Sequence, residues 1–211
     1  MLTMSTNAGR SWTTPRRLPN EFIGPVRNKP IELPDGSLLH GASTEAGGWR
    51  VHMERSFGGG ERWEKTRPLN DPVEIGAIQP TILVHDNSGI QILCRTKQGF
   101  IAESWSPDAG KSWSPMALTK LPNPNGAIDA VRLRDGRFVL AYNASASERN
   151  ALSVATSENG RDWRPELVLE KGTGEFSYPA IIQTKDDRIH ITYSWNRQRI
   201  RHVVLDTTKL Q

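Results

Sequence analysis

Histidine and cysteine are the side chains that most often bind metals or attack substrates, and this chain has few of them. Its 211 residues contain five histidines and one cysteine, Cys94. A lone cysteine excludes an internal disulfide and any metal site built from several thiolates. The histidines show no ligand spacing; they are His40, His52, His85, His190 and His202. The sequence therefore predicts no metal and no cofactor.

Basic side chains offer a second kind of chemistry, the binding of anions. The chain has 27 Lys and Arg against 23 Asp and Glu, a formal net charge of +4. This small excess suits an anionic ligand better than nucleic acid, which needs bases clustered on one face. Arg197, Arg199 and Arg201 alternate along an expected strand, so we interpret them as one solvent- or channel-facing stripe. No nucleic-acid partner is expected.

The spacing of the tryptophans indicates how such side chains are positioned. Four of the seven are separated by 51, 50 and 50 residues; they are Trp12, Trp63, Trp113 and Trp163. A fixed period of this size indicates an array of similar units. Each tryptophan follows a glycine by three residues, a turn residue by five and a hydroxyl residue by seven. The three sets are Gly9, Gly60, Gly110 and Gly160; Asn7, Gly58, Asp108 and Glu158; and Ser5, Ser56, Ser106 and Thr156.

The repeated segment predicts a self-supporting β-turn, and its fullest copy is Ser106–Trp113. An aspartate early in a turn accepts hydrogen bonds from backbone N–H groups two residues on. The glycine adopts a positive φ without strain, and the tryptophan packs under the hairpin. We assign this unit a structural role and no chemistry.

Short apolar or alternating runs separate the turns, for example residues 37–42, 90–94 and 189–193. Glycine, proline, asparagine and aspartate punctuate them, which is typical of β-strands, and no segment has a helical period. Four strands per fifty residues is the pattern of a β-propeller blade. No apolar run approaches the roughly 18 residues of a membrane span.

The four turns resemble Asp-boxes, the S-x-D-x-G-x-x-W motif of the sialidase (neuraminidase) superfamily. The final segment, Trp195–His202, resembles predicted bacterial neuraminidases with the BNR type of repeat, and the resemblance covers nearly the whole chain. It implies an all-β, six-bladed propeller and an exo-acting glycoside hydrolase. Such an enzyme releases a terminal acidic sugar, so the implied partner is an acidic glycan or sialoside.

The resemblance also implies site residues. Tyr178, in Ser177-Tyr178-Pro179, resembles the nucleophile, a role that sialidases give to tyrosine. Arg149, about thirty residues earlier, and Arg95, ahead of the Ser106 box, resemble arginines that bind the sugar carboxylate. Glu74, about twenty residues before Arg95, resembles the glutamate that assists the tyrosine. We add two further candidate substrate contacts, Arg27 and Asp129.

These residue types suit the implied chemistry. Guanidinium groups bind a carboxylate through two parallel hydrogen bonds and stay charged at every working pH. The charge of the substrate would repel a carboxylate nucleophile, whereas a phenol is neutral. Glu74 can take the phenolic proton as Tyr178 attacks the anomeric carbon.

The chain departs from the family at its start. The first arginine and the acid/base aspartate of sialidases lie before the first Asp-box, which begins here at Ser5. Residues 1–211 are therefore expected to form a single, N-terminally truncated propeller domain. We expect an incomplete arc of about three full blades and two partial ones, with exposed strand edges that favour association.

Two alternatives remain open. One is a non-catalytic or truncated propeller that binds a glycan. The other is a related enzyme acting on uronate- or rhamnose-ended polysaccharides. Residues 1–5 have neither a basic nor an apolar leader, so no signal peptide is expected, and the location is cytoplasmic if Met1 is the natural start. The sequence leaves the oligomeric state open.

Overall fold

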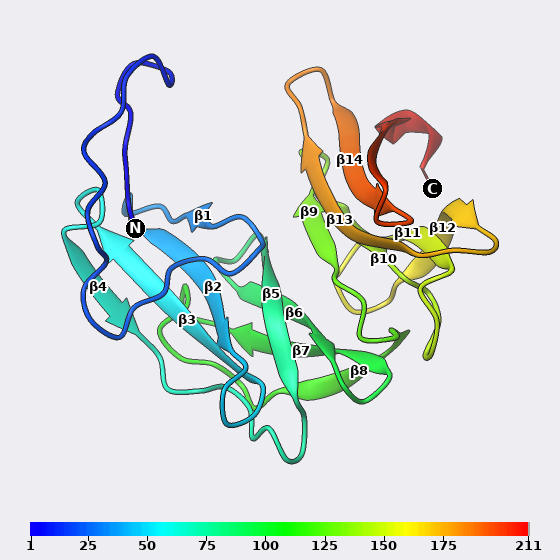
Figure 1. The fold of residues 1–211 in the computed structure, drawn as a ribbon, viewed down its shortest axis with the longest axis horizontal. Helices are drawn as coiled ribbons and strands as arrows, with labels where there is room; N and C mark the ends of the chain where they lie inside the picture. Colours follow the sequence, from blue (N-terminus) through cyan, green and yellow to red (C-terminus); the bar gives the residue numbers. More distant parts are fainter. Residues whose placement is uncertain (211) are drawn as a thin grey trace.

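The chain folds into four antiparallel β-sheets that stand side by side along an arc (Figure 1). The structure, a computed structural model, describes residues 1–210. Three sheets have four strands and the last has three. Within residues 1–210, no helix is long and apolar enough to cross a membrane. The all-β propeller architecture predicted from the repeat is confirmed.

The strands follow the chain from sheet to sheet. The first sheet contains β1 (Ile31–Glu32), β2 (Leu38–Thr44), β3 (Arg50–Phe57) and β4 (Arg62–Lys65), and the second contains β5 (Ala77–Val84), β6 (Ile90–Thr96), β7 (Phe100–Ser106) and β8 (Ala117–Pro122). The third contains β9 (Asp129–Arg132), β10 (Phe138–Tyr142), β11 (Ala151–Ser157) and β12 (Arg164–Lys171). The fourth contains β13 (Phe176–Gln183), β14 (Arg188–Trp195) and β15 (Arg199–Asp206), followed by the 3₁₀ helix η1 (Thr207–Lys209).

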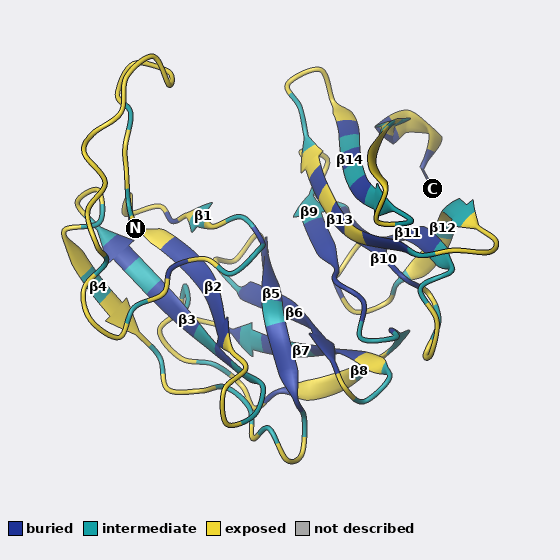
Figure 2. Ribbon diagram, in the orientation of Figure 1, coloured by how far each residue is buried: buried dark blue, intermediate teal, exposed yellow. Residues whose placement is uncertain are grey.

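The outermost strands, β4, β8, β12 and β15, contain no buried residue (Figure 2). All seven residues of β6 are buried, whereas β4 and β12 are mostly exposed. An outer edge strand buries few side chains, so apolar and polar residues need not alternate along its sequence. For this reason the apolar runs predict the inner strands of each unit more clearly than the fourth.

Apolar seams of buried side chains join each sheet to the next. Burial of apolar area is the main favourable contribution to folding. The first seam contains Leu39, Met53, Ile90 and Ile92; the second contains Leu83, Leu93, Phe138 and Leu140; and the third contains Val139, Val154, Ile189 and Ile191.

The Asp-box between β7 and β8 has the predicted geometry. The N–H of Gly110 donates to the Ser106 hydroxyl at 2.8 Å, and the N–H of Ser112 donates to Asp108 Oδ1 at 2.8 Å. Gly110 has a φ of 85°. The indole N–H of Trp113 also donates to the carbonyl of Gly110 at 3.1 Å. The tryptophan therefore closes the turn by a hydrogen bond as well as by packing.

The fourth Asp-box differs from the prediction by one residue. Thr156 and Glu158 stand at the expected positions, but the hydroxyl that accepts from Gly160 belongs to Ser157, at 2.9 Å. Asn159 Oδ1 accepts the N–H of Asp162 at 2.9 Å. This box is one residue shorter, and counting back from its tryptophan assigns the wrong side chains.

Asp108 makes the stability of its turn dependent on pH. Hydrogen bonds from the hydroxyl and the backbone N–H of Ser112 lower the pKa of Asp108 from 3.8 to about 2. A carboxyl whose pKa is lower in the folded state stabilises the fold fully above its unfolded pKa, and this contribution disappears as the pH falls. We expect the urea midpoint of Asp108→Asn to fall less than that of the wild type between about pH 5 and about pH 2. Parallel curves for the two proteins would contradict this expectation.

The first eighteen residues form a hairpin that projects from the first sheet (Figure 1). One isolated bridge, between Leu2 and Arg16, joins its two arms. The Arg16 guanidinium donates to the Gly59 carbonyl at 2.9 Å. Residues 13–18 form no strand, and the bridge at Arg16 is their only ladder contact within residues 1–210. Trp12 of the hairpin is 62% exposed.

Candidate active site

Four residues occupy equivalent positions, within or just before the innermost strand of each sheet. Each stands eight residues before the turn that leads into the second strand; they are Arg27, Gln79, Ala127 and Tyr178. All except Ala127 have left-handed backbone conformations, with φ of 69°, 57° and 57°. This conformation is uncommon for residues other than glycine. Three of the four equivalent positions therefore share an unusual backbone conformation.

Two of these residues lie in matching irregularities of their sheets. The ladder between β5 and β6 skips from Ile78 to Thr81, and that between β13 and β14 skips from Ser177 to Ala180. Gln79 and Tyr178 stand in the skipped segments, each followed by a proline, which has no N–H for the ladder. Such bulges turn a side chain away from the regular strand direction. Tyr178 is consequently 45% exposed.

Tyr178 borders a pocket of about 430 Å³. Its other charged lining residues are Arg27, Lys29 and Asp129. The guanidinium carbon of Arg27 lies 5.6 Å from the centroid of the Tyr178 ring. Arg27 also donates to the carbonyls of Ile128 at 2.8 Å and Pro179 at 2.5 Å. The structure thus brings Arg27, Asp129 and Tyr178 together, from three different sheets.

Asp129 connects all four sheets. It is 3% exposed. Its oxygens accept from Lys29 Nζ at 2.9 Å, from the Thr81 hydroxyl at 2.8 Å and from the Ile181 N–H at 3.0 Å. A further bond comes from the N–H of Ala130 at 2.9 Å. Both carboxylate oxygens of Asp129 therefore already accept hydrogen bonds from protein groups.

Arg95, at the end of β6, is a buried cation whose donors are not all used. It is 7% exposed, and within residues 1–210 its Nε and Nη1 have no hydrogen-bond partner. Its guanidinium carbon lies 5.3 Å from the Trp49 ring centroid. Burial lowers the pKa of Arg27, and the charge of Arg95 lowers it further, while Asp129 and Tyr178 raise it. The two guanidinium groups are therefore close enough to interact.

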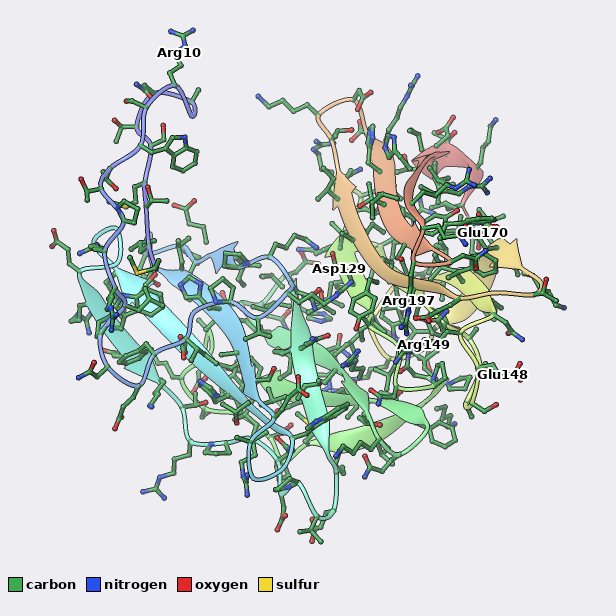
Figure 3. All side chains as sticks on the ribbon, in the orientation of Figure 1. Arg10, Asp129, Glu148, Arg149, Glu170 and Arg197 are labelled. Carbon is green, nitrogen blue, oxygen red and sulfur yellow. The ribbon has the colours of Figure 1, made fainter. Side chains whose placement is uncertain are left out.

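Arg149 lines a second pocket, of about 710 Å³. It donates to Glu175 at 3.2 Å and to the Asn125 carbonyl at 2.7 Å. Arg197 forms an ion pair with the other oxygen of Glu175 at 2.8 Å, and Figure 3 shows Arg149 and Arg197 close together below Asp129. Burial alone would raise the pKa of Glu175, but hydrogen bonds from Ser177, Arg197 and Arg149 outweigh it and lower the pKa.

The remaining predicted residues lie apart from these pockets. Glu74 is exposed in the turn between β4 and β5 and lines neither pocket. The stripe predicted for three arginines is wrong for Arg197, which stands in the turn before β15. Arg199 and Arg201 both lie over Trp195, with guanidinium carbons 4.6 and 5.5 Å from its ring.

Three residues of the site lie outside the sequence prediction. They are Lys29, Gln79 and Glu175. Gln79 could have been found by aligning the turns that follow the inner strands, because it then falls at the position of Arg27 and Tyr178. Glu175 stands three residues before Tyr178, but nothing in that spacing reveals its two arginine partners. Within residues 1–210, no three His, Cys, Asp or Glu side chains cluster as a metal site would require.

Known proteins share this architecture. The family model described as BNR repeat-like domain matches residues 1–191. No curated protein matches the chain. A protein of unknown function from Dyadobacter fermentans is similar in structure, with a TM-score of 0.80 and 17% identity over 97% of this chain and 63% of that one.

Two sialidase structures are also similar. The NanB sialidase from Streptococcus pneumoniae has a TM-score of 0.77 and 17% identity, over 99% of this chain and 36% of its own. The intramolecular trans-sialidase from Ruminococcus gnavus has a TM-score of 0.74 and 15% identity, over 99% and 50%. The chain thus spans 36% to 63% of the length of these three structures. With its Asp-box turns, its four sheets and a family match over most of its length, the chain belongs to the BNR repeat-like domain family and has a sialidase-like β-propeller fold.

Proposed function

We propose that this chain carries the substrate-binding and nucleophilic part of a sialidase-like glycoside hydrolase that releases a terminal acidic sugar. One observation supports this most directly. The exposed Tyr178 faces Arg27 in a pocket near the buried, incompletely paired guanidinium of Arg95. Two structures of the same fold are a sialidase and an intramolecular trans-sialidase by name.

The arginines bind the sugar carboxylate in this proposal. Arg95 supplies two buried N–H groups that have no protein partner, and an anionic ligand would satisfy them at little cost, because the desolvation is already complete. Arg27 adds a second positive charge. Arg149, held by Glu175, completes the binding surface from the neighbouring pocket.

Tyr178 is the nucleophile in this proposal. Its bulged, left-handed backbone holds the phenol out of the sheet and in the pocket. The family resemblance alone supports Glu74 as the acceptor of the phenolic proton, because Glu74 lies in an exposed turn and lines neither pocket. Asp129 is a positioning residue, because it holds Lys29 and, through Ile181, the part of β13 that follows Tyr178.

The scaffold proposed for this chemistry is one propeller domain over residues 1–211. Its four sheets follow the curvature of a six-bladed ring of the sialidase type and form an incomplete arc of that ring. The similarity over 99% of the chain to the two sialidase structures supports this curvature.

One observation favours a second function, glycan binding without catalysis. The only carboxylate that lines the Tyr178 pocket in residues 1–210 is Asp129, and its oxygens are occupied by protein donors. A pocket that binds acidic sugars without a free acid/base group would act as a lectin. Turnover of a sialoside distinguishes the two functions.

Titration calorimetry with N-acetylneuraminic acid, the common sialic acid, tests the shared binding step. Arg95→Met is expected to raise the dissociation constant about tenfold or more. The melting temperature should stay equal or rise, because the variant removes a buried charge whose donors are incompletely paired. Arg134→Met, at an exposed ion pair with Asp187, is the matched control and should bind like the wild type. Equal affinity of Arg95→Met and the wild type would contradict the proposal.

A further inference from the structure

We infer that Gln79 recognises a hydroxyl or N–H donor of the ligand, beside the carboxylate that Arg95 binds. This inference rests on the proposed function and makes it more specific. It selects as substrates sugar acids that carry a hydrogen-bond donor next to the carboxylate.

Gln79 occupies in the second sheet the position that Tyr178 occupies in the fourth and Arg27 in the first. All three stand eight residues before the turn after the inner strand, and all three have positive φ. A non-glycine residue in this conformation is strained by about 1 kcal/mol or more. Such strain persists where the surrounding structure enforces it, and it concentrates at functional sites.

The backbone of Gln79 is fixed on both sides. Its N–H donates to the Ser43 hydroxyl at 3.1 Å, and its carbonyl accepts from Asn28 Nδ2 at 3.1 Å. Asn28 in turn accepts from Arg27 Nη1 and lines the Tyr178 pocket. The backbone of Gln79 is thus held by two hydrogen bonds, one of them to a residue that lines the pocket. Its side chain remains free to bind a ligand.

The amide oxygen of Gln79 is a buried acceptor without a donor. Within residues 1–210, Oε1 receives no hydrogen bond. Buried polar groups are nearly always paired, so an unpaired one calls for an explanation. A carboxylate ligand supplies no donor to this oxygen, whereas a sugar hydroxyl or an N-acetyl N–H supplies one.

Unpaired donors lie on the adjacent strand. Arg95 pairs in register with Ile78, the residue directly before Gln79, and its Nε and Nη1 are the buried donors without partners. The two adjacent strands therefore carry buried cationic donors and a buried neutral acceptor one register position apart. A ligand satisfies both only if it carries a carboxylate and a donor close together, as sugar acids do.

Gln79→Gly separates recognition from stability. Glycine accepts the left-handed backbone and removes the unpaired oxygen, so the free energy of unfolding should not decrease. Affinity for N-acetylneuraminic acid is expected to fall about tenfold, the usual size for one lost hydrogen bond to a ligand. Affinity for cyclohexanecarboxylate, which has the carboxylate and a ring but no hydroxyl, should stay unchanged. A purely structural role for Gln79 would not discriminate between these two ligands.

Ser88→Gly is the matched control, because Ser88 also has a positive φ, 59°, in the exposed turn after β5. It should bind both ligands like the wild type. Gln79→Met, which keeps the side-chain length without the acceptor, should reproduce the loss of sialic acid affinity. If Arg95→Met loses sialic acid binding and both Gln79 variants retain it, the inference about Gln79 is wrong while the proposed function stands. If the wild type does not bind sialic acid, both are wrong.

Discussion

Replacing Asp129 by alanine is expected to lower the free energy of unfolding by about 3 to 5 kcal/mol. The substitution leaves Lys29 without its counter-ion and the Thr81 hydroxyl and the Ile181 N–H without their acceptor. These three groups belong to three different sheets, so the loss is felt across the whole arc. Urea unfolding followed by tryptophan fluorescence measures it.

Asp86→Ala is the matched control. Asp86 also pairs with an arginine, Arg132, but its side chain is 85% exposed, and an exposed ion pair contributes about 0 to 1 kcal/mol. Asp129→Asn, which keeps the shape of the side chain, provides a milder variant in case the alanine protein does not fold. Equal losses for Asp86→Ala and Asp129→Ala would show that the central carboxylate does not hold the sheets together.

Tyr178→Phe is expected to reduce turnover of a fluorogenic sialoside at least about a hundredfold, because the variant lacks the attacking oxygen. The substitution should leave stability almost unchanged, since Tyr178 is 45% exposed and no hydrogen bond of its hydroxyl is present among residues 1–210. Initial rates at saturating substrate give the effect on the chemical step.

Tyr193→Phe serves as the control, because it is expected to lower stability and leave turnover unchanged, the reverse of Tyr178→Phe. Tyr193 is 2% exposed, and its hydroxyl donates to Glu170 at 2.6 Å. Loss of this bond should cost about 1 kcal/mol of stability and leave turnover unchanged. Full activity in Tyr178→Phe would exclude Tyr178 as the nucleophile. Absence of turnover in the wild type, together with sialic acid binding, would support the glycan-binding function.

The fold could be predicted from the sequence because each repeat contains a turn motif that is recognisable within a short segment. The tryptophan period counts the units, and the Asp-box turns fix where the third strand of each of the first three sheets ends. Both depend on local interactions within about ten residues, such as those of Ser106, Asp108 and Gly110, so a single segment is enough to reveal them. The fourth box, where Ser157 and Asn159 replace the expected pair, shows how a one-residue deletion defeats simple counting.

The candidate site was harder to predict because it joins residues from different repeats. Arg27 and Tyr178 are 151 positions apart in the chain. They come into contact only because the first and fourth sheets pack around a common centre. Asp129 was predicted as a substrate contact, whereas its oxygens are bonded to the protein, a fact that depends on Lys29, Thr81 and Ile181. The pairing of Glu175 with both Arg149 and Arg197 could not be predicted either, because it joins side chains from three separate segments of the chain.

The contacts of Lys29 with Asp129 and of Arg27 with Pro179 also affect how the molecule unfolds. Seams between neighbouring sheets make a repeat protein quasi-one-dimensional, so that its end units can open independently. Here Lys29 joins the first sheet to the third through Asp129, and Arg27 joins the first to the fourth through the Pro179 carbonyl. An end sheet cannot leave without breaking bonds to sheets that are not its neighbours. We therefore expect the four sheets to unfold as one cooperative unit, whereas the projecting hairpin of residues 1–18, with its single bridge, can open separately.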